Sequence, residues 1–435
     1  MSMLHPEFET LSQTEIRRLQ DNLWRHQWEY VRSQSEFYKR KLGNLADNAN
    51  VFLEDLEKLP FTDKDELRIS QESSYPYGDY AACDLDKVTR VQITSGTTGK
   101  PLILANTRDD LSWISRVGGR AFYASGLRPG DRVVHCLNYC LWTGGLTDHL
   151  NLEATGASVV PFGVGNVDKL LDTILDLGIN AISCTPSYPA LLEQRLEQRG
   201  LEPKDLGLKL ALFGGEAGLD DVNFRSKLEN TWGFAVRNAN YGMSEVMSIL
   251  ASQTTTSNDL CFHASDAVFV ELIDANGVSL PVVEGNTGEL VCTHLRKECQ
   301  PLIRYRTRDL ITVTQSEPSA SGRTSWRFRV VGRTDDMFNV RGINVFPSAI
   351  QEAIRQHIDI STGEFRIQLI GKGPWDYISL KVEAARSLKK TEWKVAALSL
   401  EQSIKKVTGA SAKVTLIPAD TLPRTAGKTQ LIERI

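Results

Sequence analysis

Apolar residues recur at two different spacings along the first half of the chain. Between residues 15 and 40, Leu19, Leu23, Trp24, Trp28 and Val31 follow helical intervals, which predicts one amphipathic helix or two at the edge of a domain. Further on, short apolar runs alternate with helical patterns. The expected strands are residues 88–93, 132–137, 158–161, 181–184 and 209–213, and the expected helices are residues 167–177 and 189–199. This alternation is typical of parallel strands with helices on both faces.

The pattern changes after about residue 255 to short strands separated by turns. Strands are expected at residues 267–273, 288–293, 309–314 and 326–331, and Asp274-Ala275-Asn276-Gly277 is a turn signal. A second break follows Gly332, and from there to Ile435 a β-α-β rhythm predicts a small α+β domain. The predicted fold class is α/β: a large N-terminal domain over residues 1–333, with a β-rich subdomain at about 255–331, and a small C-terminal domain over residues 334–435.

Composition and charge narrow the function classes. The chain has 435 residues, of which 41% are hydrophobic and 24% are charged, which is ordinary for a globular protein. A formal net charge of −4 supplies no basic field for nucleic acid or an anionic membrane. The sequence has no apolar run of about twenty residues and no apolar core of a signal peptide near its start. We therefore expect a cytoplasmic protein with no nucleic-acid or membrane partner.

Cysteines leave one metal hypothesis open. The seven cysteines show no repeated spacing, so a secreted disulfide framework is not expected and most should be buried apolar side chains. Thiolates and imidazole are the ligands zinc prefers, although no CxxC pair is present here. A structural zinc site is thus a candidate beside the expected alternative of no metal, and its ligands would be Cys261, His263, Cys292 and Cys299.

The most informative short segment is Thr94-Ser-Gly-Thr-Thr-Gly-Lys-Pro101, directly after the first predicted strand. Two glycines allow a sharp turn and a close approach of backbone N–H groups to a polyanion, while hydroxyls and one lysine add donors. The spacing differs from a Walker A loop, and Pro101 stands where that motif has Ser or Thr. An ordinary surface turn is the alternative. The density of such residues favours a phosphate-binding loop formed by Ser95, Gly96, Thr97, Thr98, Gly99 and Lys100.

Five further segments carry chemistry in a fixed order. They are Leu212-Phe-Gly-Gly-Glu216, Asn240-Tyr-Gly-Met-Ser-Glu245, Arg304-Tyr-Arg-Thr-Arg-Asp309, Gly332-Arg-Thr-Asp-Asp336 and Pro423-Arg-Thr-Ala-Gly-Lys428. Each alone is weak, since a single acid, arginine or aromatic residue is more often a surface or core residue. In this order and at these intervals, the segments resemble the adenylate-forming superfamily of acyl-CoA synthetases, luciferases and peptide-synthetase adenylation domains. Residues 332–348 and Tyr-Arg-Thr-Arg-Asp resemble its phenylacetate-CoA ligase branch in particular.

The resemblance implies an enzyme, an AMP-forming acid–thiol ligase. A carboxylate attacks the α-phosphate of ATP to give acyl-AMP and pyrophosphate, and a thiol, usually of coenzyme A, then displaces AMP. Lys428 would be the principal catalytic residue and would lie on a mobile C-terminal domain. Glu245 would bind Mg²⁺, which prefers hard oxygen ligands, and Ser244 would contact the α-phosphate. ATP, Mg²⁺ and coenzyme A are the implied cofactors.

The resemblance also implies a nucleotide site. Tyr241 would stack on adenine, because an aromatic face offers area at low entropic cost, and Asp309 would accept both ribose hydroxyls. Arg333 would lie near ribose and phosphate. A hinge is expected at Asp335, since two half-reactions at one site need different residues to approach it. The remaining nucleotide-site residues are Gly214, Gly215, Glu216, Asn240 and Gly242.

The residues expected to line the acid pocket are inferred from their positions relative to the motifs of the family that the chain resembles. Aromatics beside glycines form a flat slot, which favours an aryl or arylacetyl acid over a long alkyl chain, and Trp142 shortens this slot. Benzoate or anthranilate types are slightly preferred to phenylacetate. An ordinary core role is the alternative for each aromatic residue. The expected lining residues are Tyr139, Trp142, Thr143, Gly144, Gly145, Thr185, Pro186 and Phe213, together with Ser183.

Three functional hypotheses remain open from the sequence. The first is an aryl-CoA ligase in aromatic degradation or secondary metabolism. The second is a stand-alone adenylation enzyme that loads an acyl or amino acid onto a carrier protein in trans, and the third is a nucleotide-binding regulator without activity. The intact acids and Lys428 argue against the third. A small aromatic acid and coenzyme A are the expected partners, with a carrier protein and a homodimer as further candidates.

Overall fold

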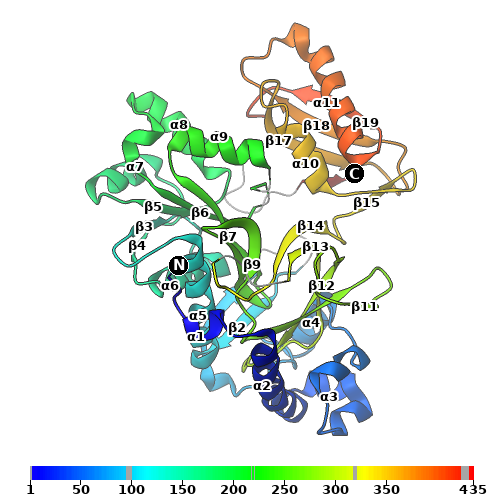
Figure 1. Cartoon of the computed structure of the whole chain (residues 1–435). Helices are drawn as coiled ribbons and strands as arrows, with labels where there is room; N and C mark the ends of the chain where they lie inside the picture. The colour runs from blue at the N-terminus through cyan, green and yellow to red at the C-terminus, as the bar shows by residue number, and fades with distance from the viewer. Residues whose placement is uncertain (1, 95–99, 217, 220, 317–320, 423–430) are drawn as a thin grey trace. The chain divides into compact units, whose positions relative to one another are not determined.

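The structure is a computed structural model that describes residues 2–94, 100–216, 218–219, 221–316, 321–422 and 431–435. The chain divides into two compact units. The first consists of Met1–Gly214 and Phe234–Val330, and the second of Gly215–Gly233 and Val331–Ile435. The predicted fold class, a large α/β N-terminal part with a small α+β C-terminal part, is confirmed (Figure 1). The predicted boundary at residues 333 and 334 stays a prediction.

The first unit is built on one sheet in which twelve strands are described, in the order β11-β10-β12-β13-β14-β9-β8-β7-β6-β5-β3-β4. Its parallel part contains β3 (Arg132–His135), β4 (Ser158–Pro161), β5 (Ala181–Cys184), β6 (Leu210–Gly214) and β7 (Ala235–Met243). The other strands are β8 (Met247–Thr254), β9 (Ser257–Phe262), β10 (Val268–Ile273), β11 (Ser279–Leu280), β12 (Thr287–His294), β13 (Tyr305–Gln315) and β14 (Arg327–Arg333).

Strand β7 explains why the β-rich segment is not a separate sheet. It pairs in parallel with β6 on one side and antiparallel with β8 on the other. The change from parallel to antiparallel pairing therefore occurs at β7, and β8 begins at Met247, ahead of the position near residue 255 at which the sequence pattern changes. The antiparallel strands extend the same sheet, because β9 pairs with β8 and β14, although later in the chain, pairs with β9 and joins it to β13.

Helices and a hairpin accompany this sheet. The predicted N-terminal helical segment is two helices, α2 (Gln13–Gln34) and α3 (Glu36–Leu42), because Ser35 ends the first and caps the second by accepting a hydrogen bond from Tyr38 N. β1 (Val88–Ile93) and β2 (Ile103–Thr107) form an antiparallel hairpin. The other α-helices described here are α1 (Pro6–Glu9), α4 (Lys64–Ser73), α5 (Arg108–Ser125), α6 (Thr143–Glu153), α7 (Val167–Asp176) and α8 (Tyr188–Arg199). Short 3₁₀ segments cover Gly43–Asp47, Leu53–Lys58, Leu85–Lys87 and Pro203–Leu206.

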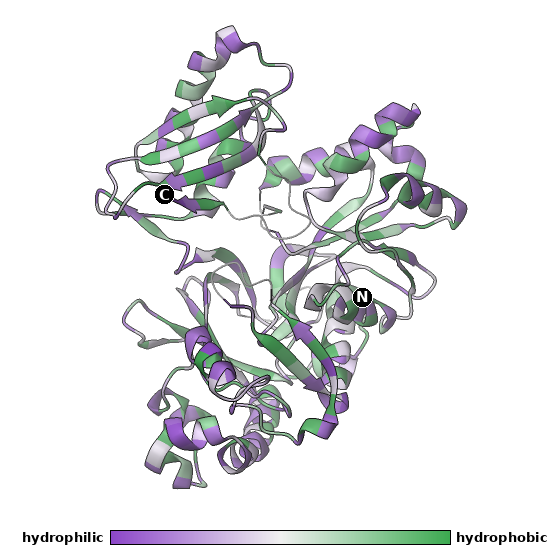
Figure 2. Cartoon of the chain, turned by 180° about the vertical axis from the view of Figure 1, so that it is seen from behind, coloured by the Kyte–Doolittle hydropathy of each residue, from purple (hydrophilic) through white to green (hydrophobic). Residues whose placement is uncertain are grey.

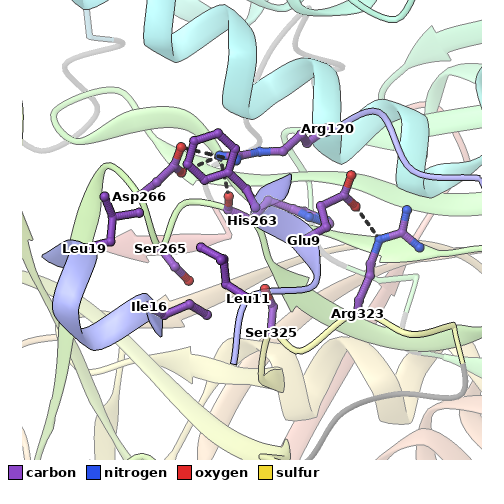
Figure 3. A pocket seen from close by; sticks show the side chains of 11 residues that line it. Glu9, Leu11, Ile16, Leu19, Arg120, His263, Ser265, Asp266, Arg323 and Ser325 are labelled. Atoms are coloured by element: carbon purple, nitrogen blue, oxygen red, sulfur yellow. Dashed lines mark hydrogen bonds and ion pairs between the residues drawn. The ribbon is translucent and has the colours of Figure 1, made fainter. Parts of the chain in front are cut away.

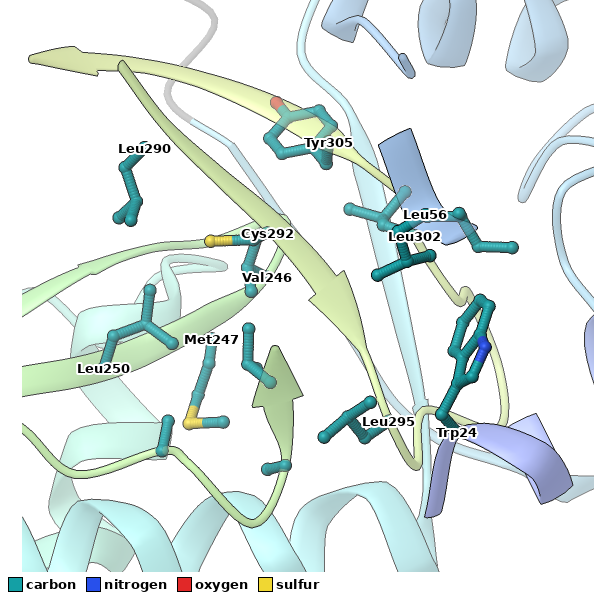
Figure 4. Packing of buried hydrophobic residues seen from close by; sticks show 14 of the residues in the cluster. Trp24, Leu56, Val246, Met247, Leu250, Leu290, Cys292, Leu295, Leu302 and Tyr305 are labelled. Carbon is teal, nitrogen blue, oxygen red and sulfur yellow. The ribbon is translucent and has the colours of Figure 1, made fainter. Parts of the chain in front are cut away.

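The main hydrophobic core of the first unit joins the N-terminal helices to the antiparallel strands. Trp24 and Trp28 of α2 are buried in one cluster with Leu56, Leu295 and Tyr305. Figure 4 shows Trp24 with the last three of these residues. The indole N–H of Trp24 donates to Val51 O at 2.8 Å, which satisfies its polar edge inside the core. Helices on the outside carry hydrophilic and hydrophobic residues on different faces (Figure 2), as the periodicity predicted.

The second unit contains a four-stranded sheet in the order β19-β18-β17-β20. Its strands are β17 (Ser361–Leu369), β18 (Ile378–Ala384), β19 (Ala412–Ile417) and β20 (Ile432–Arg434), and α10 (Pro347–Arg355) and α11 (Trp393–Thr408) contribute buried residues to the same core. A hairpin of β15 (Phe338–Val340) and β16 (Ile343–Val345) precedes them, α9 (Val222–Trp232) also belongs to this unit, and a 3₁₀ turn covers Lys390–Glu392. Among the helices described in either unit, none is long and apolar enough to span a membrane.

A buried polar cluster connects α5 and α6 with β7 and β8. Position 118 of α5 requires glycine, because a Cβ there would lie 2.2 Å from the Asn151 amide of α6. One turn before Asn151 on α6, the fully buried Asp148 accepts a hydrogen bond from Asn240 Nδ2 of β7, and its Oδ1 has no hydrogen-bond partner. Burial raises the pKa of Asp148 from 3.8 to about 8, against the opposing effect of Ser248 and Asn240. The carboxyl group is therefore mostly protonated near neutral pH.

Replacing this carboxyl should change how stability depends on pH. Between about pH 4 and pH 8, Asp148 is ionised in the unfolded chain and protonated in the folded protein, so the free energy of unfolding falls as pH rises. Asn at this position keeps an acceptor for Asn240 and does not titrate. We expect Asp148→Asn to be more stable than the parent at about pH 8, by up to roughly 5 kcal/mol, and to lose this advantage toward about pH 4.

Urea unfolding followed by tryptophan fluorescence across this pH range measures the effect. The exposed Asp176→Asn is the matched control and should follow the parent. Parallel pH profiles for Asp148→Asn and the parent would contradict a raised pKa at Asp148.

Candidate nucleotide and acid site

The predicted phosphate-binding loop lies between the two strands of the β1–β2 hairpin. Ser95, Gly96, Thr97, Thr98 and Gly99 lie outside the described residues. Both ends of the segment are fixed, because Thr94 N donates to Leu102 O at 3.0 Å and Leu102 N donates to Thr94 Oγ1 at 2.9 Å. Lys100 is exposed and pairs with Glu72 at 2.9 Å.

The carboxyl end of β6 lies directly beside the predicted adenine segment of β7. Gly214 is paired with Asn240, and a Cβ on Gly214 would approach the Asn240 side chain at 2.5 Å, so only glycine allows this register. Gly215 has a positive φ of 81°, which directs the chain away from the strand. The half-buried Glu216 follows in the second unit. The bond from Asn240 to Asp148 holds this end of β7 to α6.

Two residues predicted for the nucleoside are hydrogen-bonded to each other. The hydroxyl of Tyr241 on β7 donates to Asp309 Oδ2 on β13 at 2.8 Å, and Asp309 is only 8% exposed. The Tyr241 ring also packs edge-on against Phe328, with ring centroids 5.1 Å apart. A ring and a carboxylate from segments 68 residues apart are thus brought together, as adenine and ribose recognition would require.

The turn from β7 to β8 carries Ser244 and Glu245. It is tight, because a Cβ on Gly242 would lie 2.3 Å from Ser248 O. The hydroxyl of Ser244 shares a hydrogen bond of 2.7 Å with Thr143 Oγ1 at the start of α6, and Glu245 Oε1 lies 2.5 Å from Lys64 Nζ at the start of α4. A pocket of about 370 Å³, which includes open solvent, adjoins this turn. Gln92, Thr143, Ser244, Glu245 and Lys297 are among its lining residues.

The predicted acid-pocket residues come from three neighbouring segments. Thr143, Gly144 and Gly145 begin α6, and a Cβ on Gly144 would lie 2.8 Å from the Trp142 ring, so the indole occupies the space that a side chain at residue 144 would need. The Tyr139 hydroxyl bonds to His149 Nδ1 at 2.9 Å. Thr185 and Pro186 follow β5, where Thr185 shares a 3.2 Å hydrogen bond with Ser187. Phe213 is fully buried and packs edge-on against Phe234.

A buried histidine fixes the start of α6. His135 Nε2 lies 3.0 Å from the carbonyl oxygens of Gly144 and Gly145, and its Nδ1 lies 3.0 Å from Ser183 Oγ. Because carbonyl oxygens only accept, Nε2 carries the proton and Nδ1 accepts from Ser183. Burial lowers the pKa of His135 to about 4, so the ring is neutral near pH 7. Its role is therefore structural: it holds the two glycines at the carboxyl edge of β3.

The remaining predicted site residues belong to the second unit. Arg333 forms two hydrogen bonds of 2.9 Å with the carboxylate of Asp335, the predicted hinge residue. Lys428, predicted as the catalytic lysine, lies outside the described residues.

The candidate zinc site is not formed by the described residues. No group of three or more His, Cys, Asp or Glu side chains in the described part of the chain is placed to hold a metal. His263 Nε2 bonds to Ser252 Oγ at 2.9 Å, and Cys299 interacts with Cys83. Burial raises the pKa of Cys261 to about 11 and raises that of Cys292 further, which keeps both as thiols. The zinc hypothesis for Cys261, His263, Cys292 and Cys299 is corrected accordingly.

Sequence reasoning missed two ionisable partners of the site. Lys64 is 181 positions from Glu245 in the sequence, and nothing in its local pattern connects them. Asp148 follows five uncharged residues at the start of α6, Thr143–Thr147. An acidic residue among buried helix positions was the available signal.

Comparison with known proteins gives the family. The AMP-binding enzyme family matches residues 36–294, and the AMP-binding enzyme C-terminal domain matches residues 342–433. Phenylacetate-coenzyme A ligase of Thermus thermophilus is 34% identical over 445 residues, covering 98% of this chain and 97% of that protein. The protein of the same name from Escherichia coli is 32% identical over 427 residues, covering 97% and 95%.

Solved structures agree with this assignment. The crystal structure of 2-hydroxyisobutyryl-CoA ligase in the postadenylation state with 2-HIB-AMP is 28% identical, with a TM-score of 0.90, and covers 99% of this chain and 92% of that chain. An anthranilate CoA ligase in complex with anthranoyl-AMP is 18% identical with a TM-score of 0.57, which supports the shared fold alone. The chain belongs to the AMP-binding enzyme family and is similar over nearly its whole length to phenylacetate-coenzyme A ligases.

Proposed function

We propose that the protein is an AMP-forming acid–thiol ligase that activates a small aromatic carboxylic acid with ATP and transfers the acyl group to coenzyme A. The observation that carries the proposal is the hydrogen bond between Tyr241 and Asp309 on strands adjoining the Ser244–Glu245 turn. It brings two separate sequence motifs into direct contact. Relatives named as phenylacetate-coenzyme A ligases, aligned over nearly the full chain, support the same reaction.

In the first step the acid's carboxylate oxygen attacks the α-phosphorus of ATP, and pyrophosphate leaves. Such a transfer needs charge neutralisation and alignment more than covalent help from the protein. Asp309 would accept the ribose hydroxyls, for which its bond to Tyr241 already fixes the carboxylate plane. Tyr241 would present its ring to adenine beside the glycine-lined end of β6. Ser244 would exchange its bond with Thr143 for one to an α-phosphate oxygen.

Glu245 fits the expected Mg²⁺ site. Its carboxylate is a hard oxygen ligand whose side chain is only 8% exposed, and its present partner is a lysine ammonium, which shows that the position favours a cation. Mg²⁺ is commonly held by one or two carboxylates with phosphate and water oxygens. When bound, the ion would neutralise phosphate charge as pyrophosphate leaves. Lys64 would then be released from Glu245 and remain nearby as a further cation.

In the second step a thiolate sulfur attacks the acyl carbon, and AMP leaves with the carboxylate oxygen that bridged to phosphorus. The two steps share one acyl-adenylate but need different neighbours. We propose that the second unit supplies them in turn, with Lys428 serving the first step and Asp335 acting as hinge. The pair of Arg333 with Asp335 supports a defined backbone at that point.

The acid is proposed to be a small monocyclic aromatic carboxylate, benzoate or anthranilate type slightly before phenylacetate type. The support is the close approach of the Trp142 ring to Gly144 at the start of α6. We expect wild-type kcat/KM to be highest for an aromatic acid, to differ between benzoate and phenylacetate by roughly 10–200-fold at most, and to be negligible for octanoate. Trp142→Ala should admit bulkier acids and lower kcat/KM for the preferred one.

Pyrophosphate release across a panel of acids measures this preference, with thioester formation followed separately with coenzyme A and with a carrier protein. The control variant is Leu141→Ala, because Leu141 precedes Trp142 in the sequence and is exposed. A higher kcat/KM for octanoate than for every aromatic acid would contradict the proposed aromatic-acid pocket. Thioester formation only on the carrier protein would contradict coenzyme A as the acceptor.

Lys428→Ala should separate the two half-reactions. Loss of one preorganised charge donor typically costs about 10²–10³-fold in kcat, so acid-dependent pyrophosphate release should fall at least that far. Thioester formation from supplied acyl-AMP should remain largely intact. Lys413→Ala, an exposed lysine on β19, is the control. Equal loss in both half-reactions would argue against an adenylation-specific role.

The hinge proposal predicts a different asymmetry. Asp335→Pro fixes φ at this position and should impair one half-reaction far more than the other. Asp335→Ala removes the pair with Arg333 but leaves the backbone free, so it should affect both steps mildly. Each variant is measured by pyrophosphate release and by thiolysis of supplied acyl-AMP. The same loss in both steps, or no loss, for the proline variant would contradict a hinge at Asp335.

A further inference from the structure

The segment that suggested zinc contributes to a strongly cationic interior. Strand β14 pairs with β9, and Arg327 lies opposite Cys261. Trp326 stacks on Phe262 and contacts Phe328, with ring centroids 5.2 and 4.9 Å apart, on the core side of the sheet. Because side chains alternate along a strand, Arg327 and Cys261 point to the other face.

Arg327 is buried there without a counter-charge. It is only 2% exposed, and its Nε and Nη2 are buried with no hydrogen-bond partner. Among the described residues, no carboxylate lies within ion-pair distance of its guanidinium. A guanidinium group does not lose its proton in proteins, so Arg327 remains charged. A buried charge is normally paired, because removal from water is costly.

Two further buried arginines lie around the same side chains. Arg323 Nε donates to Glu9 Oε2 at 2.6 Å, while its Nη2 is buried without a partner. Arg120 pairs with Asp266 and donates to His263 O at 3.0 Å, and its Nε is likewise unpartnered. Figure 3 shows these as two separate ion pairs that come from different segments of the chain.

The charges on this face do not balance. The three buried arginines Arg120, Arg323 and Arg327 face two buried carboxylates, Asp266 and Glu9. His263 adds no charge, because burial and then Arg323, Arg120 and Arg327 hold its pKa well below its ordinary value. Burial also raises the pKa of Cys261, against the opposing effect of Arg327 and Arg323, so the thiol adds no negative charge near pH 7. Counted over the described residues, one of these three positive charges, that of Arg327, has no ion-pair partner.

A hollow adjoins this face. It measures about 400 Å³, part of it open to solvent, and its lining includes Glu9, Arg120, His263, Asp266 and Arg323 (Figure 3). A small ion therefore has a route to the guanidinium groups of Arg120 and Arg323, which line the hollow. The positive field disfavours Zn²⁺, the ion that the sequence suggested, and favours an anion.

We propose that the guanidinium groups of Arg323, which lines this hollow, and of Arg327, four residues further along the chain on β14, bind one small oxyanion. The unpartnered Nε–H and Nη2–H of Arg327 form a planar fork that matches the oxygen spacing of phosphate or sulfate better than a spherical halide, and Arg323 adds its unpartnered Nη2. Bound there, the anion supplies the missing negative charge and links the N-terminal segment that carries Glu9 to β14. The site is independent of the nucleotide residues and of the reaction proposed above.

Thermal unfolding of the whole protein tests the proposal. Purified protein is titrated with inorganic phosphate, with sulfate, and with chloride at matched ionic strength. Phosphate and sulfate should raise Tm saturably by about 2–4 °C, because an anion that binds only the folded state stabilises it. Chloride should give only a small, non-saturating change. An equal effect of chloride and phosphate would reduce the result to charge screening and overturn the site.

Arg327→Met identifies where the anion acts. This variant should lose the saturable phosphate effect, and without oxyanion its Tm should equal or exceed that of the parent, because an uncompensated buried charge is gone. Arg329→Met, two residues along β14 and exposed beside Asp259, is the matched control and should keep the full effect. Arg323→Met should be destabilised with or without phosphate, because it leaves Glu9 buried and unpaired.

These variants distinguish oxyanion binding at Arg323 and Arg327 from phosphate binding at the nucleotide site. If Arg327→Met keeps the saturable phosphate response, the anion binds elsewhere and the proposal fails. A lower Tm for Arg327→Met than for the parent in the absence of oxyanion would also overturn it, since the guanidinium would then be satisfied within the protein.

Discussion

The double pairing of β7 is the constraint on which the rest of the structure depends. This strand closes the parallel part of the sheet against β6 and opens the antiparallel part against β8. Its residues therefore meet groups from both halves: Asn240 reaches Asp148 on the helical side, and Tyr241 reaches Asp309 on the antiparallel side. The turn that follows delivers Ser244 and Glu245 to the starts of α6 and α4. One strand thus assembles residues that the sequence scatters over about half the chain.

Buried charge is handled in different ways within the first unit. Asp148 is kept neutral by burial, Asp110 and Lys297 form a buried pair at 3.6 Å, and Arg304 pairs with Glu271 at 2.9 Å. These arrangements either remove the charge or compensate it, which limits the cost of desolvation. Within the described residues, the charge of Arg327 is neither removed nor compensated by an ion pair. This exception is the reason for proposing that an anion from solution binds there.

The sequence predicted the fold class well because periodicity is a local property. The parallel strands β3 to β6 appear within two residues of their expected positions, and the helix at residues 189–199 begins one residue earlier, at Tyr188. No strand was expected at residues 235–243, which form β7. The single twelve-stranded sheet was not predicted, since the pairing of β7 with β8 depends on contacts rather than on pattern. The motif order identified Tyr241, Asp309, Ser244 and Glu245 as one site, and the geometry brings Tyr241 to Asp309.

What the sequence did not predict are the partners of these residues. Lys64, Asp148 and Thr143 meet Glu245, Asn240 and Ser244 only through tertiary packing. The zinc hypothesis failed for the same reason, because ligand types at plausible spacing say nothing of the field around them. Three arginines on neighbouring segments make that field positive, and neither Cys261 nor His263 reveals them in its local sequence.

The most direct measurement of the central claim follows the oxygen atoms of the acid. If the carboxylate attacks the α-phosphorus of ATP and AMP leaves on thiolysis, one carboxylate oxygen must end in AMP. Turnover of an aromatic acid labelled with ¹⁸O in its carboxylate, in the presence of ATP, Mg²⁺ and coenzyme A, is analysed by mass spectrometry of the products. The account predicts one labelled oxygen in each AMP formed and none in pyrophosphate. Label in inorganic phosphate with ADP as the nucleotide product, or thioester formation with unlabelled AMP, would contradict it.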